Sequence, residues 1–371
     1  MTGETSRRGG GTMAALVALL WAANAMAQEA APPGASIPLA ATPSEIAAIH
    51  FQSTIIEQGY PAFAAPYSGP NSLPPGGEGR ETFDFTLYGG VAPWRGAQIW
   101  INPEIDQGFG LHDTTGVAGF TNGDGAKVGK SNPYMRLQRL FLRQTFDLGG
   151  EVSTVDADLN QLAGAQTADR LVLTLGKFNA TDIFDTNTYA HDSKHDFLNW
   201  SLVDAGTFDY AADAWGYTVG GAAELYRGDW VGRFGLFALS VVPNGEDLDP
   251  SFGEFQIDGE VARDFKIAGR DGALKITGFL SRGRMASFVD AIALALATHM
   301  PADVSVVRRY QGRGGISLNL QQQLTEAIGV FARAGFDAGS VEPYEYADID
   351  RTVSAGISVS GKAWGRPGDR F

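Results

Sequence analysis

The stretch GISLNLQQQLTEAIGVFARAGF, residues 315–336, decides the fold class of this chain. In its first half Ile316, Leu318 and Leu320 alternate with polar residues, and the alternation resumes after LTEA, where Ile, Val, Ala, Ala and Phe occupy every second position of 328–336. Successive side chains of a β-strand point to opposite faces, so this period of two predicts a β-hairpin with one apolar and one polar face. The fold class then depends on whether a protein core or a lipid bilayer covers the apolar face.

The same alternation recurs along most of the chain. It predicts about twelve strands, most of them close to the length of about nine to eleven residues with which a tilted strand crosses a bilayer. The predicted ranges are 49–58, 80–90, 97–104, 136–148, 170–178, 214–227, 229–242, 254–265, 272–283, 307–321, 327–337 and 350–362. In 229–242 both faces are apolar, so the pattern does not assign an outer face there. In 136–148, Phe141 shares a face with Arg139 and Arg143.

The connections between these strands alternate in length. Long connections follow the odd-numbered strands, whereas tight turns such as RGD (227–229) and QLTEA (323–327) follow most even-numbered ones, with the medium-length 149–169 as the exception. An up-and-down barrel with one end in the periplasm produces this parity, and a β-sandwich or propeller gives no reason for it. The sequence therefore predicts an all-β fold, a transmembrane antiparallel up-and-down β-barrel whose apolar face meets lipid and whose polar face lines a lumen.

The composition excludes several other classes of protein. The chain has 371 residues, no cysteine, 48 glycines and a formal charge of −14. An acidic chain has no electrostatic reason to bind nucleic acid, so we expect no such partner. Outside the N-terminus no apolar run reaches the roughly 18 residues of a transmembrane helix, and the nearest, AIALALATHM at 291–300, is too short to span.

The N-terminus has the pattern of an export signal. Arg7 and Arg8 precede an apolar stretch, and AMA at 25–27 forms a small-x-small cleavage site. We therefore expect a signal peptide at 1–27 and an Ala/Pro-rich flexible lead-in at 28–48. The barrel would then occupy 49–371.

Six further stretches resemble the carbohydrate-selective outer-membrane porins (OprB type), in order along nearly the whole mature chain. They are PAFAAPYSGPNSLPP (61–75), NPEIDQGFGL (102–111), RLFLRQTFDLGGE (139–151), NQLAGAQTADRLVLTLGKF (160–178), FLNWSLVDAGTFDYAADAWGY (197–217) and VEPYEYADIDRTVSAG (341–356). The resemblance implies a sixteen-stranded barrel with inward-folded loops in the bacterial outer membrane. Such a porin passes mono- and small oligosaccharides passively, without catalysis or cofactor. Outer-membrane lipid and, during biogenesis, the barrel-assembly machinery are its implied partners, and association into a homotrimer is left open.

The chain departs from the family pattern at its end. Members of the family carry further strands after the region that matches 350–362, whereas this chain ends with GKAWGRPGDRF. Gly365, Pro367 and Gly368 are poor strand formers. The expectation is a C-terminally truncated sequence that lacks about four strands.

Sugars are neutral, rich in hydroxyl groups and have flat apolar faces. A path that holds them weakly needs aromatic rings and polar or charged hydrogen-bonding groups. Strand parity gives the lumen candidates Asp84, Trp100, Asn102, Arg139, Arg143, Asn319, Gln321 and Arg333, with Glu104, Asp106 and Gln107 at a strand end near the pore mouth. We expect Trp100 to act as a stacking platform and the two arginines of 136–148 to donate to hydroxyl groups. The alternative for each residue is a solvated side chain or an ion pair across the barrel.

The connection 179–213 is long, rich in Asp, His, Phe and Trp, and long enough to fold inward and narrow the channel. The HDSKH sequence at 191–195 within it spaces two histidines as in a zinc protease, but lacks the glutamate base and an evident third ligand. DADLN at 156–160 departs from the calcium-loop template, although a calcium ion at an exposed loop stays open. DGAKVGKS at 124–131 lacks the first glycine of a phosphate loop.

No metal site, no catalytic residue and no nucleophile set is therefore predicted. Three alternatives to a sugar porin remain. They are an outer-membrane channel for other small nutrients or cations, an outer-membrane barrel enzyme, and a soluble β-rich binding protein.

Overall fold

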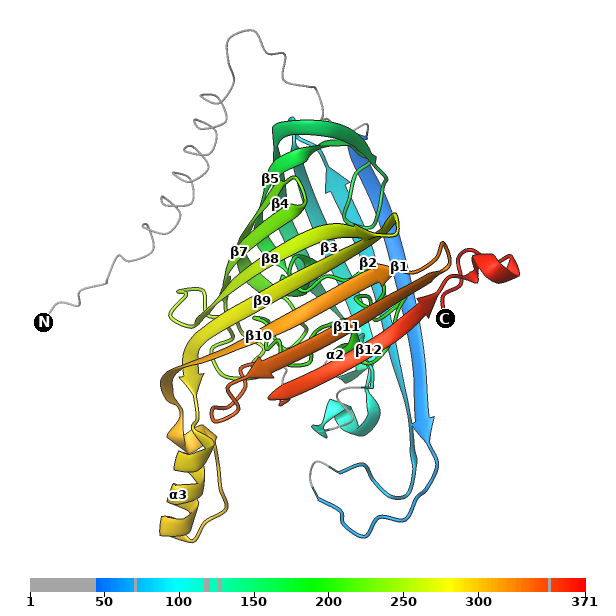
Figure 1. Cartoon of the computed structure of the whole chain (residues 1–371). Coiled ribbons are helices and arrows are strands. Elements are labelled where there is room, and N and C mark those ends of the chain that lie inside the picture. Colours follow the sequence, from blue (N-terminus) through cyan, green and yellow to red (C-terminus); the bar gives the residue numbers. More distant parts are fainter. Residues whose placement is uncertain (1–44, 70–71, 117–120, 126–128, 346–347) are drawn as a thin grey trace, which may run out of the picture.

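The computed structural model describes residues 45–69, 72–116, 121–125, 129–345 and 348–371 (Figure 1). The predicted signal peptide and all but the last four residues of the predicted lead-in lie outside these ranges. Within them, the structure contains no helix with the length and apolar character that a membrane span requires.

Twelve strands form one antiparallel sheet in which each strand pairs with the next along the chain, as the alternation predicted (Figure 1). The strands are β1 (Ala47–Tyr60), β2 (Glu78–Val91), β3 (Ala97–Gly108), β4 (Lys130–Val155), β5 (Gly164–Phe178), β6 (Thr218–Arg227), β7 (Trp230–Ala238), β8 (Phe255–Ile267), β9 (Arg270–Met285), β10 (Arg309–Gln323), β11 (Ile328–Asp337) and β12 (Arg351–Val359). All twelve predicted ranges overlap these strands in order.

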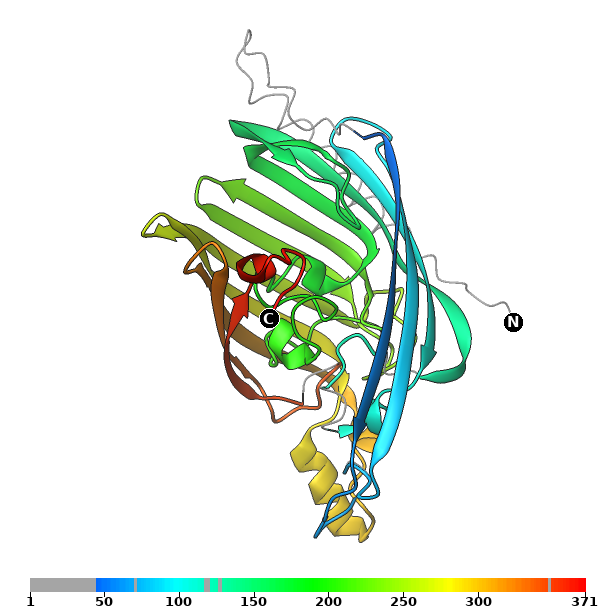
Figure 2. The ribbon, with the colours of Figure 1, turned by 90° about the vertical axis from the view of Figure 1, so that its right-hand side faces the viewer.

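The sheet curves round to enclose an interior, and it is open between β1 and β12, which each pair with a single strand among the described residues (Figure 2). Short helices lie in the connections. They are η1 (Leu111–Thr114), η3 (Ala180–Asp182), α2 (Trp200–Val203), α3 (Phe288–Thr298), η4 (Ser305–Val307) and η5 (Gly361–Trp364). Helix α3 projects beyond the ends of β9 and β10 (Figure 1).

The predicted medium-length connection 149–169 is mostly strand. β4 and β5 pair as far as Val155 and Gly164, so only 156–163 connects them. Gly149 and Gly150 have positive φ angles of 109° and 86°, and the register of the pair shifts on both sides of Gly149. This β-bulge interrupts the alternation, which is why the sequence pattern ended the strand too early.

The hairpin at 315–336 has the two faces that its sequence predicts. Leu318 on β10 is 47% exposed on the outward face, whereas its neighbour Asn319 is 1% exposed and points inward. On β11, Phe336 points outward and is 51% exposed, while Arg333 is buried. The enclosed interior is therefore polar along these strands, and the outward face is apolar.

Aromatic–arginine pairs border the outward apolar band at both ends. Near the short-turn end, the Arg263 guanidinium lies 5.2 Å from the ring centre of Trp230. Near the long-loop end, Arg282 and Arg284 lie 5.8 and 5.3 Å from the ring centre of Tyr310. Aromatic residues at both borders of an apolar band are typical of a sheet that spans a bilayer.

A charge on this band is expected to destabilise the protein. Leu318→Arg places a guanidinium in the middle of the apolar band, and we expect a loss of about 2–4 kcal/mol in the free energy of unfolding. Leu324→Arg is the control, because it makes the same substitution in the β10–β11 turn, beyond the end of the strand. It should lower the free energy of unfolding by about 0–1 kcal/mol. Urea unfolding of both variants in lipid vesicles measures the difference. Equal losses would mean that the outward face of β10 does not lie in lipid.

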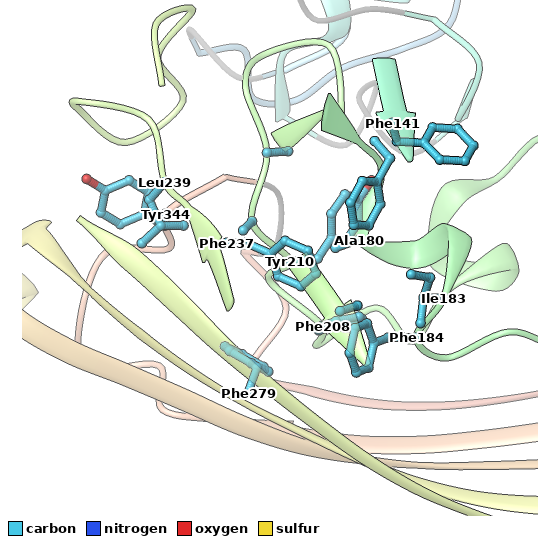
Figure 3. Close-up of a cluster of buried hydrophobic side chains, with 14 of the residues drawn as sticks. Phe141, Ala180, Ile183, Phe184, Phe208, Tyr210, Phe237, Leu239, Phe279 and Tyr344 are labelled. Carbon is cyan, nitrogen blue, oxygen red and sulfur yellow. The ribbon is translucent and has the colours of Figure 1, made fainter. Parts of the chain in front are cut away.

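Both faces of β7 are apolar for a reason that the sequence could not give. Phe234 and Leu236 point outward and are 56% and 40% exposed, whereas Phe237 points inward and is fully buried. The Phe237 ring packs edge-on against Phe178 and Phe184, with ring centres 5.7 and 6.0 Å away (Figure 3). Phe184 belongs to the connection between β5 and β6, so the inward face of β7 meets protein.

Candidate functional site

The connection 179–217, between β5 and β6, lies inside the space that the sheet encloses (Figure 2). We call it the infolded segment. Its first turn is η3, where the Asn179 side chain accepts a hydrogen bond from the Thr181 backbone N–H at 2.9 Å. The predicted inward fold of 179–213 is therefore present.

A buried ion pair fastens the infolded segment to the wall of the sheet. Asp185 is fully buried, and its Oδ2 lies 3.1 Å from Nε of Arg333 on β11. The same guanidinium donates to the backbone carbonyls of Leu202 and Ala190 at 2.7 and 2.8 Å. Asn319 on β10 donates to Oδ1 of Asp185 at 2.7 Å. These bonds satisfy the buried charges and fix the middle of the segment against β10 and β11.

Two glycines of β11 allow the segment to come this close. A Cβ atom on Gly329 would lie 2.0 Å from the Tyr189 ring, and one on Gly335 would lie 2.0 Å from Oγ1 of Thr207. Only a residue without a side chain leaves room for these contacts.

An aromatic cluster fills the space between the segment and β7–β9 (Figure 3). Phe208 of the segment packs against Phe279 of β9, with ring centres 5.7 Å apart. Together with the contact of Phe184 and Phe237, this cluster gives the infolded segment an apolar core of its own. The interior is therefore partly filled by protein.

The opposite side of the segment is held by charged groups. Lys194 lies 2.7 Å from Asp84 on β2 and 3.3 Å from Asp124. Burial alone would lower the pKa of Lys194, but the two carboxylates outweigh burial and raise it. Asp182 forms a bidentate pair with Arg139 of β4, at 2.8 and 2.7 Å. Burial opposes ionisation of Asp182, and the guanidinium beside it still lowers the pKa of that carboxyl.

Two cavities lie beside the infolded segment. The loop-side cavity, of about 690 Å³, lies toward the long connections. Its charged residues are Asp84, Glu104, Asp106, Asp124, Arg139, Asp182, Asp192, Lys194, Asp204, Glu345 and Asp348, and its aromatic residues are Tyr88, Trp200, Tyr210, Trp215 and Tyr217.

The turn-side cavity, of about 870 Å³, lies toward the short turns. Its charged residues are Arg143, Asp156, Asp158, Arg170, Asp182, Asp192, Glu224 and Arg233, and it is also lined by His191 and His195. Arg233 bridges Glu224 and Glu260 across β6, β7 and β8.

The two cavities meet at five residues that line both. They are Leu159, Asn160, Asp182, His191 and Asp192, and we call this place the junction. It lies where the β4–β5 turn approaches the infolded segment.

Of the titratable groups at the junction, His191 is the one whose pKa lies closest to neutral pH. Its Nδ1 lies 3.5 Å from Oδ1 of Asp204. Burial by itself lowers the pKa of His191, but the neighbouring carboxylate outweighs burial and raises the pKa. The junction therefore combines an imidazole with two carboxylates and an amide.

Five of the eleven predicted lumen and pore-mouth residues line these cavities. Asp84, Glu104, Asp106 and Arg139 line the loop-side cavity, and Arg143 lines the turn-side cavity. Arg143 donates to the backbone carbonyl of Asn160 at 2.9 Å, next to the junction.

The other six line neither cavity. Gln107 donates to the backbone carbonyl of Ser131 at 2.8 Å, and the remaining five point inward. Asn319, Gln321 and Arg333 bind the infolded segment; Gln321 exchanges hydrogen bonds with Thr188, both at 2.9 Å. Asn102 donates to the Asn160 side chain at 2.9 Å. Of these four, Arg333 forms the ion pair across the interior that the alternative describes, whereas the three amides form hydrogen bonds.

The structure does not offer Trp100 to a solute as the expected stacking platform. Its side chain is fully buried, and the ring lies against Gly90, where a Cβ atom would be 2.5 Å from ring carbons. The His50 ring is parallel to it at 6.2 Å. Parity placed Trp100 on the correct face, but parity does not show that neighbouring residues cover the ring.

Sequence reasoning missed most of the aromatic and junction residues. Tyr88 has inward parity and could have been predicted, whereas Trp200 lies in a connection without periodicity. Trp215 and Tyr217 were expected in the predicted strand 214–227, but β6 begins at Thr218, so both lie in the infolded segment. The composition of that connection indicated Asp, His and Trp near the channel, and only the fold shows that His191 and Asp192 reach the junction.

The family model described as "Carbohydrate-selective porin, OprB family" matches residues 71–371. The high-pH structure of Pseudomonas putida OprB is similar over 87% of this chain and 72% of that chain, with 14% identity and a TM-score of 0.59, which shows a shared fold. OccK8 (OprE) of Pseudomonas aeruginosa aligns over 87% of this chain and 81% of that chain, with 8% identity and a TM-score of 0.38. No curated protein matches the chain.

Proposed function

The chain belongs to the OprB family of carbohydrate-selective porins, and we propose that sugars cross the membrane through the interior of its sheet. Their path runs through the loop-side cavity, the junction and the turn-side cavity. The protein is thus an outer-membrane porin for carbohydrates, and the proposal concerns the path. The observation that carries it is the junction, where two solute-sized cavities share five residues.

The lining supports a path for sugars. Trp200 and Tyr217 border the loop-side cavity, and aromatic rings offer flat surfaces to the apolar faces of a sugar ring. The ring of Trp215, which also lines this cavity, is covered by the Arg136 guanidinium at 3.3 Å from the ring centre. Arg139 and Arg143, one on each side of the junction, carry guanidinium groups that suit hydroxyl and ring oxygens. No covalent step is involved, because conduction requires weak binding and release.

The volumes support passage of mono- and small oligosaccharides by passive diffusion. Both cavities fall within the range of about 300–1,000 Å³ that small-molecule sites occupy. The infolded segment, anchored by Asp185 and Arg333, sets the width of the path.

We propose no catalysis for this channel. His195 contacts Asp192 at 2.7 Å and His191 faces Asp204, so each histidine is paired with a carboxylate. Within the described parts of the chain, no group of three His, Cys, Asp or Glu side chains is arranged to hold a metal ion.

The cellular setting is also part of the proposal. Residues 1–27 would direct export, 28–48 would form the lead-in, and 49–371 would form the membrane domain. The outward apolar band, with its arginine and aromatic borders, supports contact with outer-membrane lipid. Insertion by the barrel-assembly machinery and association into a homotrimer stay predictions.

A tryptophan at the junction tests the path. Asp192→Trp adds an indole where the two cavities meet, and we expect several-fold slower swelling of liposomes in isosmotic sugar, with the disaccharide affected more than the monosaccharide. Asp156→Trp is the matched control, because it removes the same charge and adds the same ring but lines the turn-side cavity alone. If liposomes that contain the unaltered protein swell no faster than empty liposomes, the proposed function is contradicted. Equal slowing by both variants would contradict the path.

A further inference from the structure

The loop-side cavity is strongly acidic. Nine carboxyl groups line it, against the cationic side chains of Arg139 and Lys194 and the imidazole of His191. The turn-side cavity is closer to balance, with five carboxylates, three arginines and two histidines. The negative charge is therefore concentrated on the side of the junction that a solute from the medium meets first.

Both cations of the loop-side cavity are already neutralised. Arg139 is bound by Asp182 through two hydrogen bonds of 2.8 and 2.7 Å, and Lys194 lies between Asp84 and Asp124. Among the described lining residues, the basic side chain that remains is His191, which faces Asp204, so the carboxyl groups stay in excess.

Buried acceptor atoms of the cavity give a second observation. Gln138 lines the cavity and is 1% exposed; its Nε2 donates to Glu104 at 3.0 Å, and its Oε1 has no hydrogen-bond donor among the described residues. Oδ2 of Asp106 likewise has no donor in the described part of the chain. Acceptors without donors fit a ligand that donates hydrogen bonds, such as an ammonium group.

From this arrangement we infer that the channel selects by charge, admitting neutral sugars and protonated amino sugars and retarding sugar acids and sugar phosphates. The inference rests on the proposed path, because it assigns the selection to the cavity through which sugars enter. A narrow cavity with walls of one sign concentrates its field, since low-dielectric walls screen the charges poorly. A potential of about −1 kT favours monovalent cations over anions about sevenfold.

Reversal potentials in planar bilayers measure the selection directly. In a KCl gradient the protein should be more permeable to K⁺ than to Cl⁻ by about sevenfold, and less so at high salt, where the field is screened. In liposomes, glucosamine at pH 6 should enter several-fold faster than glucuronate. Glucose, which is neutral, serves as the size-matched reference.

Two double variants assign the selection to the cavity. Glu104→Gln with Asp348→Asn removes two carboxylates that line the loop-side cavity alone, and the K⁺/Cl⁻ ratio should fall at least about threefold. Glu151→Gln with Glu326→Gln removes the same charge from residues that line neither cavity, and should leave the ratio unchanged. The ratio is independent of how much protein inserts.

The outcomes separate the two proposals. A ratio at or below one in the unaltered protein overturns charge selection, and this test needs no variant to fold. An equal fall in both double variants also overturns it, because net charge would then be the cause. If charge selection is overturned by one of these results but glucose still enters, the proposed function is retained. Glucose uptake no faster than in empty liposomes contradicts the proposed function.

Discussion

Replacing Arg333 with methionine is expected to lower the free energy of unfolding by about 3–5 kcal/mol, because the change leaves Asp185 as a buried carboxylate without its counter-ion. The guanidinium also binds the carbonyls of Leu202 and Ala190, so three points of the infolded segment lose their donor together. We expect the segment to detach from β11 before the sheet itself unfolds. Thermal unfolding in detergent and limited proteolysis within the segment measure the two effects.

Arg227→Met is the matched control for this change. Arg227 pairs with Asp169 at 3.0 Å near a short turn, and its side chain is 61% exposed. An exposed pair contributes about 0–1 kcal/mol, so this variant should unfold nearly as the unaltered protein does. The same stability in the two arginine variants would show that the buried pair does not hold the segment.

A double variant tests whether the two residues act as a unit. Asp185→Asn keeps an oxygen that can accept from Asn319, and in combination with Arg333→Met it removes both charges of the pair. The double variant should lose less stability than the two single variants together. Additive losses would assign the effect to other contacts of Arg333.

Excising the infolded segment is expected to raise the single-channel conductance several-fold. Phe178 and Thr218 are paired at the ends of β5 and β6, so an Asn-Gly turn can replace 179–217 without changing the register of the strands. The excision would join the loop-side and turn-side cavities into one open space. Larger oligosaccharides should then enter liposomes that the unaltered protein makes permeable only to small sugars.

The control for this excision is the removal of 288–304, which includes helix α3. This helix projects beyond β9 and β10 and lines neither cavity (Figure 1). Its removal should leave the conductance within the range of the unaltered protein. Unchanged conductance after loss of the infolded segment would mean that another part of the chain limits the flow.

The sequence predicted the wall of the channel well and its interior poorly. Alternation assigned Leu318 outward and Asn319 inward because burial on a sheet follows the backbone period. It failed at Gly149 and Gly150, where a bulge resets the period, and it could not assign Phe237, which is apolar and points into protein.

The roles of inward residues depend on contacts across the interior. Arg333 and Asn319 have the parity of solute contacts, yet they bind Asp185, which lies more than a hundred positions earlier in the chain. Trp100 has the expected direction, but His50 and Gly90 cover its ring. Local sequence patterns do not predict contacts between such distant residues. The junction residues His191 and Asp192 lie in a connection without periodicity, so the sequence did not predict their positions either.

The anchors of the infolded segment also constrain the order in which the protein can fold. Asp185 and Arg333 are 148 positions apart, and Asn187 and Asn319 are 132 apart. The segment is synthesised and translocated well before β10 and β11, so the strands that it binds are absent until late in folding. Contacts of such long sequence separation form slowly. The interior must therefore mature after its wall, and until then Asp185 and Arg333 remain solvated ions in an unfinished lumen.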